Sequence, residues 1–146
     1  MTGRSDVVTE AREWLGTRWH HQASVKGVGT DCVGLVGGVA LALGIPGSDE
    51  WRTNAALHNY GRQPSAELLE AAAERLLNPI AFADAVAGDI VLFRFNGDPT
   101  HFAILTRTDP AVMIHAYAQA RRVVENRLDD LWRSRVVRAY SYPGIE

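Results

Sequence analysis

The sequence predicts an α+β fold, with N-terminal helices packed on a C-terminal antiparallel sheet of about five strands. Up to residue 77, apolar side chains recur at helical spacing. After residue 86, short β-rich runs alternate with turns rich in Gly, Asn, Asp and Pro. Helices that are followed in the chain by an antiparallel meander are typical of this fold class.

Three helices are predicted in the first part of the chain. Residues 6–15 carry an apolar stripe at helical spacing. Residues 32–43 are apolar on all sides, which predicts a buried helix. Residues 65–77 place leucines on one side and glutamates on the other, so we expect an amphipathic helix. Residues 17–31 show no periodicity and are expected to form a loop.

Five β-rich runs and one short helical turn are predicted in the second part of the chain. The runs are residues 90–95, 102–106, 112–116, 123–127 and 136–142, and the helical turn is residues 129–134.

Length and composition indicate one globular domain, residues 1–146. The chain has 146 residues, of which 47% are hydrophobic and 22% charged, so a disordered chain is excluded. The formal charge of −2 gives no basis for nucleic-acid binding. The most apolar stretch, residues 33–45, is too short to span a bilayer, so no membrane insertion is expected. The N-terminus lacks the pattern of a signal peptide, so we expect synthesis in the cytoplasm.

Cys32 is the one cysteine of the sequence. It is either a small buried residue of the core or a reactive thiol. Its place at the start of the predicted helix favours the second interpretation, because the helix dipole and free N–H groups would lower the pKa of the thiol. The same N–H groups could bind an oxyanion. Asp31 would raise this pKa, and we interpret it as the N-cap of the helix.

His101 and His115 lie in two neighbouring predicted strands. If these strands pair in antiparallel fashion, the two residues lie opposite or diagonal to each other. One imidazole could then orient the other, as in the nucleophile, base and orienter of a cysteine peptidase. The alternative is that both are ordinary core histidines.

Four short segments stand in order within residues 7–142: Asp31–Val36 (DCVGLV), Ala87–Phe93 (AGDIVLF), His101–Ile104 (HFAI) and Ile114–Ala116 (IHA). In wording and in order they resemble the NlpC-type cell-wall peptidases, a papain-like family.

The resemblance implies a papain-like core that hydrolyses an amide bond in peptidoglycan stem peptides, between D-γ-glutamyl and a diamino acid. By position, Cys32 would be the nucleophile. His101 would be the base that takes the thiol proton and later protonates the leaving amine, and His115 would orient His101. No cofactor is implied.

The sequence departs from the family pattern at two places. Val33 stands where the family has Ser after the cysteine. Trp19 stands where many members have a Tyr whose hydroxyl helps at the oxyanion site, and His20 or His21 could supply the missing donor. These four residues are the candidate substrate or oxyanion contacts.

The residues around Trp19–Gln22 (WHHQ) resemble the phage-tail and gene-transfer-agent branch of the family. This resemblance implies tail proteins as partners. It also implies that a tail-like particle carries the protein to the periplasm and cell wall.

Other interpretations stay open. The same residues could serve a papain-like amidase or acyltransferase on another substrate, or the chain could be a non-enzymatic tail hub or plug. A metal site built from His20, His21 and His58 with the other histidines is not expected, because the spacing does not match the usual ligand patterns. Trp14, Trp51 and Trp132 are expected to pack in the core, although Trp51, Asn54 and Tyr60 could border the substrate.

Overall fold

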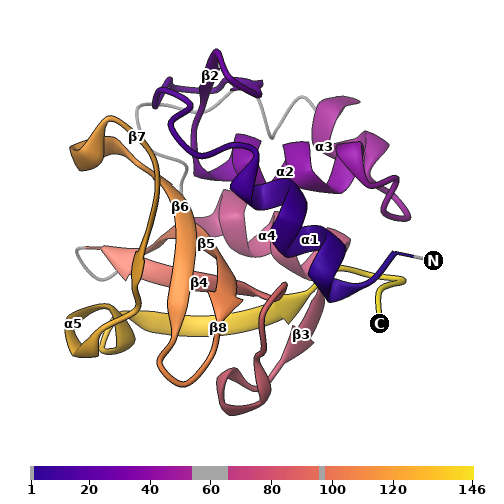
Figure 1. The fold of residues 1–146 in the computed structure, drawn as a ribbon. Coiled ribbons are helices and arrows are strands. Elements are labelled where there is room, and N and C mark those ends of the chain that lie inside the picture. Colours follow the sequence, from indigo (N-terminus) through magenta and orange to yellow (C-terminus); the bar gives the residue numbers. More distant parts are fainter. Residues whose placement is uncertain (1, 54–65, 96–97) are drawn as a thin grey trace.

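The computed structural model describes residues 2–53, 66–95 and 98–146 and has the expected α+β fold (Figure 1). Its helices are α1 (Arg4–Arg12), α2 (Cys32–Ala42), α3 (Asp49–Thr53), α4 (Ala66–Leu76) and α5 (Asp130–Arg133). Its strands are β1 (Ser24–Val25), β2 (Gly29–Thr30), β3 (Asn78–Ile80), β4 (Ile90–Phe95), β5 (Asp98–Arg107), β6 (Val112–Tyr117), β7 (Arg122–Arg127) and β8 (Val136–Ser141). Ser65, where the third helix was expected to begin, lies outside the described residues.

The main sheet has six described strands in the order β3-β8-β4-β5-β6-β7, and all neighbours are antiparallel. The five predicted β-rich runs all belong to this sheet. The additional strand is β3, a three-residue edge strand that contains Pro79. Proline is tolerated at an edge because no ladder hydrogen bond is needed on the open side. The small β1–β2 hairpin also lies where a loop was expected.

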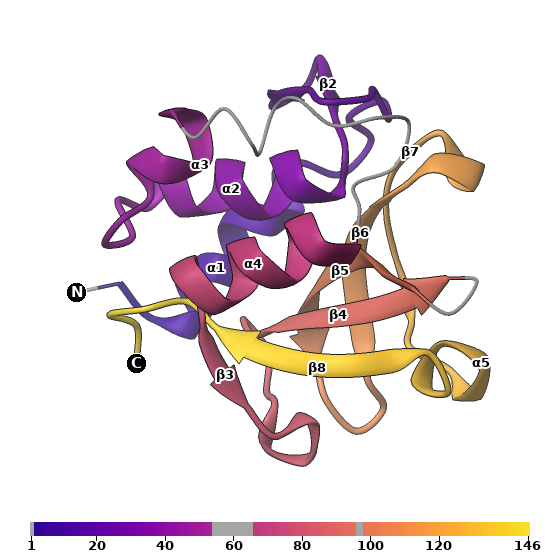
Figure 2. The same cartoon turned by 180° about the vertical axis from the view of Figure 1, so that it is seen from behind.

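The helices α1, α2 and α4 cover one face of the sheet (Figure 2). Helix α2 is buried along most of its length, as its uniformly apolar sequence predicts. Two of its glycines make room for tryptophans, since a Cβ on Gly38 would lie 2.4 Å from the Trp14 ring and one on Gly37 would lie 2.9 Å from the Cβ of Trp51. Trp14 and Trp51 are therefore core residues.

The opposite face of the sheet holds a second, smaller core. Figure 1 shows β6 and β7 running across the direction of β4 and β8, so the sheet is strongly curved. The short helix α5 lies beside this face and contributes Trp132, which packs edge-on against Phe93 at 5.1 Å between ring centroids. This aromatic cluster lies next to both histidines that the sequence singled out.

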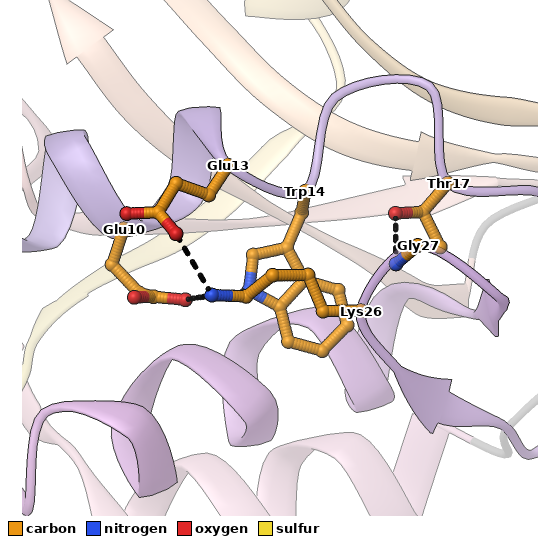
Figure 3. A network of polar contacts seen from close by, with 6 residues as sticks. All are labelled: Glu10, Glu13, Trp14, Thr17, Lys26 and Gly27. Atoms are coloured by element: carbon orange, nitrogen blue, oxygen red, sulfur yellow. Dashed lines mark hydrogen bonds and ion pairs between the residues drawn. The ribbon is translucent and has the colours of Figure 1, made fainter.

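The segment between α1 and α2 is tied to α1 by a polar network (Figure 3). The Lys26 ammonium contacts the carboxylates of Glu10 and Glu13, and the Trp14 indole N–H also donates to Glu10. The Gly27 N–H donates to the Thr17 hydroxyl at 3.0 Å. This network fixes the segment that leads into Cys32.

The turn into β4 is shaped by Asp89. Its buried carboxylate accepts hydrogen bonds from the Val86 N–H at 2.9 Å and from the Arg4 Nε at 2.9 Å. Among the described residues, no helix has the length and hydropathy needed to cross a membrane.

Candidate active site

Cys32 is the first residue of α2, and Asp31 is the N-cap, as predicted. One Asp31 carboxylate oxygen accepts from the Gly34 N–H at 2.8 Å, and the other accepts from the Gln22 N–H at 2.8 Å. The first bond satisfies a free amide at the start of the helix. The second joins the helix start to the preceding loop.

Gly34 brings the first turn of α2 directly against the β1 segment. A Cβ at this position would lie 2.0 Å from the Ala23 carbonyl oxygen, so no side chain fits without a backbone shift. The Ser24 hydroxyl also donates to the Gly34 carbonyl at 2.7 Å. These contacts of Gly34 with Ala23 and Ser24 hold the first turn of α2, and therefore Cys32, in place.

The Cys32 thiol lies against the start of β5. Its sulfur is 4.0 Å from the Thr100 carbonyl oxygen, and the Phe102 N–H is also directed at it. These two backbone groups flank His101. Cys32 and His101 line one cleft of about 550 Å³, hereafter the cleft. Its other lining residues are Trp19, Asp31, Phe95, Thr100, Ala116, Tyr117, Ala118, Gln119, Leu131, Trp132 and Arg135.

The two histidines are in direct contact. The distance between His101 Nε2 and His115 Nδ1 is 2.8 Å, and both side chains are buried. Ile104 pairs with Ile114, so continuing this register sets the two histidines diagonal to each other on the same face. The expected cross-strand contact is therefore present.

Asn126, on β7, continues this chain of contacts. Its Oδ1 lies 2.7 Å from His115 Nε2, and its Nδ2 donates to the Arg127 carbonyl at 3.0 Å. The sequence interpretation missed this residue. A signal was present, because asparagine is unfavourable within a strand and the β6–β7 register sets it diagonal to His115.

Hydrogen-bond accounting assigns the protons along this chain. The Arg127 carbonyl can only accept, so the Asn126 amide must turn its oxygen toward His115. His115 then carries its proton on Nε2 and accepts on Nδ1, which requires the His101 Nε2 to donate. His101 Nδ1 is left with a free lone pair, as a general base requires.

Aromatic rings surround the histidine pair. Tyr117 stacks on His115 at 5.1 Å between centroids, and Trp132 packs edge-on against His115 at 5.1 Å. The Arg135 guanidinium lies over the rings of Trp132 and Phe95 at 5.5 and 5.2 Å. The pair is therefore shielded from water, which strengthens its hydrogen bonds.

Burial sets the ionisation of the three titratable groups. Desolvation, with a smaller contribution from the Asp31 carboxylate, raises the pKa of Cys32 to about 12. Desolvation also lowers the pKa of His101 well below its usual value, with His115 adding to the effect. The pKa of His115 falls to about 4 through burial, opposed by the hydrogen bond to Asn126.

The expectation that the helix start lowers the pKa of Cys32 is therefore wrong. The N–H groups of Phe102, Val33 and Cys32 do favour the thiolate, but loss of hydration at a buried sulfur outweighs them. Both shifts favour the neutral form, which is a thiol on Cys32 and an imidazole on His101.

The other residues singled out from the sequence occupy different places. Trp19 lines the cleft, and its ring stacks on that of His21 at 6.4 Å. His20 is exposed, and neither His20 nor His21 belongs to the described lining of the cleft. Val33 is buried and lines a neighbouring hollow of about 270 Å³ with Trp51.

Some expectations cannot be placed. Asn54, His58 and Tyr60 lie outside the described residues. Within the described residues, no group of three or more His, Cys, Asp or Glu side chains is arranged to hold a metal ion.

Comparison with solved structures defines the class of fold, which is that of the NlpC/P60 domains. The structure of the NlpC/p60 domain of the peptidoglycan hydrolase SagA matches with a TM-score of 0.64 and 21% identity, over 96% of this chain and 99% of that one. An NlpC/P60 family protein from Bacillus cereus matches with a TM-score of 0.68 and 19% identity, over 96% of this chain. A lipoprotein-like NLP/P60 family protein from Staphylococcus aureus matches with a TM-score of 0.61 and 19% identity, over 98% of this chain.

The chain spans 40% of the Bacillus cereus protein and 42% of the Staphylococcus aureus protein. No family model matches the sequence, and no curated protein matches it. The predicted papain-like α+β fold is confirmed by the solved structures, and the activity has to be inferred from the site.

Proposed function

We propose that this chain is a cysteine peptidase that hydrolyses an amide bond in peptidoglycan stem peptides, between D-γ-glutamyl and a diamino acid. The observation that carries the proposal is the chain of contacts from Asn126 through His115 to His101, which lines the same cleft as Cys32, the only cysteine of the sequence. The fold is shared with SagA, which is described as a peptidoglycan hydrolase.

The first half of the reaction forms a tetrahedral intermediate bound to Cys32. The Cys32 sulfur attacks the scissile carbonyl carbon while its proton passes to His101 Nδ1. Because burial favours the neutral form of both groups, we place the proton transfer in the same step as the attack. The Cys32 N–H at the start of α2 is the proposed donor to the developing oxyanion. The imidazolium of His101 is stabilised by donating from Nε2 to His115.

The second half releases the products. His101 gives its proton to the leaving amine as the amide C–N bond breaks, which leaves an acyl-thioester on Cys32. A water then attacks the thioester carbonyl, and His101 takes a proton from it. Collapse of this intermediate releases the new carboxylate and returns the proton to the sulfur.

We further propose that the protein acts as part of a phage-tail or gene-transfer-agent particle, which would deliver it to the periplasm and cell wall. The support for this step is the Trp19–Gln22 segment, whose residues resemble that branch of the family. If the proposal holds, the protein co-sediments with tail structures from producing cells, and absence from purified particles would contradict it.

The hydrolysis is tested with purified sacculi and mass spectrometry of the released peptides. The wild type should release fragments with a new amino terminus on the diamino acid, and Cys32→Ala should release none. In H₂¹⁸O, hydrolysis places one ¹⁸O in the new glutamyl carboxylate, whereas acyl transfer to an amine does not. Circular dichroism of Cys32→Ala serves as the folding control. Equal cleavage by Cys32→Ala would overturn the proposal.

A further inference from the structure

A second hollow, of about 610 Å³, adjoins the cleft. It is lined by Gly16, Arg18, Trp19, Ala118, Arg121 and Arg122, and we call it the arginine groove. Trp19 and Ala118 line the cleft as well, so the two hollows share a wall. A peptide bound at Cys32 could therefore extend into the arginine groove past the Trp19 ring.

Backbone pairing holds the three arginines together. Arg18 and Arg122 are partners in an antiparallel β-bridge. The Trp19 N–H donates to the Arg121 carbonyl at 2.9 Å, which places the third arginine beside them. Main-chain contacts set this clustering, and contacts between the flexible side chains are not needed for it.

Within the described residues, no carboxylate forms an ion pair with this cluster. The ion pairs among the described residues involve other cations, and none includes Arg18, Arg121 or Arg122. The described lining of the groove contains no Asp or Glu. The sequence of the segments outside the described ranges contains no Asp or Glu. Three like charges are thus gathered at one place in a chain whose net charge is −2.

We propose that the arginine groove binds a free carboxylate of the substrate peptide. The inference rests on the proposed function and deepens it. A γ-linked glutamate keeps its α-carboxylate free close to the scissile bond, and the diamino acid carries a further carboxylate. Guanidinium groups bind carboxylates through paired, charge-assisted hydrogen bonds. The shared Trp19 wall favours an anion of the bound peptide over a phosphate of another wall polymer.

The test compares stem peptides in which one carboxylate at a time is converted to an amide. Wild type, Arg18→Gln, Arg122→Gln and the triple Gln variant are assayed on each peptide. Arg138→Gln, an exposed arginine on β8 outside the groove, is the matched control. For the wild type, one amidation should raise KM by about tenfold with little change in kcat. The triple variant should show the same KM for that amidated peptide and for its parent.

Binding is measured separately from cleavage. Calorimetric titration of Cys32→Ala with the uncleaved peptides should show the same preference, and the preference should disappear when the three Gln substitutions are added. Equal KM for all peptides in the wild type, or a preference that survives in the triple variant, would overturn the arginine groove as a carboxylate site. Tighter binding of inorganic phosphate than of the peptides would also overturn it. If the peptides bind in a carboxylate-dependent way but the wild type cleaves none of them, the arginine groove stands as a carboxylate site and the proposed hydrolase activity is rejected.

Discussion

Burial shifts the pKa values in the two halves of the site in opposite directions. At the helix end, removing the Cys32 thiol from water raises its pKa to about 12. At the sheet end, the same loss of hydration lowers the pKa of His101 well below its usual value and that of His115 to about 4. Each shift favours the neutral form.

This comparison shows that position at a helix N-terminus does not by itself decide the charge of a thiol. The amides directed at the sulfur are present, yet desolvation dominates. In the proposed mechanism the reacting form is the neutral pair, which is favoured between the pKa of His101 and that of Cys32. The activity should therefore show an acid limb well below pH 6.5 and no alkaline decline up to about pH 9.

The largest effect is expected from removing the base at the sheet end. His101→Ala should lower kcat/KM by about 10⁴-fold, because His101 is the proposed acceptor of the thiol proton. His115→Ala should lower it less, by about 10²-fold, because water can partly replace an orienting group. Steady-state kinetics on a stem peptide measure both, and equal losses would show that the two histidines do not differ in role.

The helix end can be probed by alkylation. With a pKa near 12, Cys32 should react with iodoacetamide about 10³-fold more slowly at pH 7 than a free cysteine, and the rate should rise about tenfold per pH unit. Mass spectrometry of quenched samples gives the rate, and the urea-unfolded protein is the control. Fast, pH-independent labelling would instead indicate a thiolate–imidazolium pair.

The histidines should also make stability depend on pH. A histidine with a lowered folded-state pKa contributes stability above its unfolded value of about 6.5, and this contribution is lost as the pH falls toward its folded value. For His115, with a folded pKa of about 4, the loss between pH 6.5 and 4 is about 3 kcal/mol in the free energy of unfolding.

Urea unfolding at several pH values measures this loss. The lowered pKa of the buried His101 also makes the free energy of unfolding fall as the pH falls. His115→Gln cannot titrate, so its stability should fall less steeply over the same range. A slope identical to that of the wild type would contradict the assignment of this pH dependence to His115.

The smallest effect is expected at Asn126, which acts through His115. Asn126→Ala removes the acceptor that sets the His115 tautomer, so kcat should fall by about tenfold with KM nearly unchanged. Arg127→Ala is the matched control, because only the carbonyl of Arg127 takes part in the contact. A kcat for Asn126→Ala equal to that of this control would mean that the contact does not matter for the reaction.

The long, periodic elements could be predicted from the sequence. The buried helix expected at residues 32–43 is α2, and the run expected at 90–95 is β4 with the same bounds. The missed elements are short. Helix α3 has five residues and β1 and β2 have two each, which is too few to show a period.

The site was predictable in part. The contact between His101 and His115 follows from strand pairing, which the sequence pattern supports. The pKa of Cys32 could not be predicted, because it depends on how deeply the sulfur is buried under β5. The arginine groove could not be predicted either, because Arg18 is far in the sequence from Arg121 and Arg122. The β-bridge between Arg18 and Arg122, which brings them together, is known only from the structure.

Gly34 limits how this protein could be redesigned. Any larger residue there would press on the Ala23 carbonyl and displace the first turn of α2, and the sulfur would move with it. A protein engineer who wishes to change substrate scope should therefore leave this side of the cleft intact. Leu131 and Gln119 line the cleft and are exposed, so they offer positions where diversity can be introduced without moving the nucleophile.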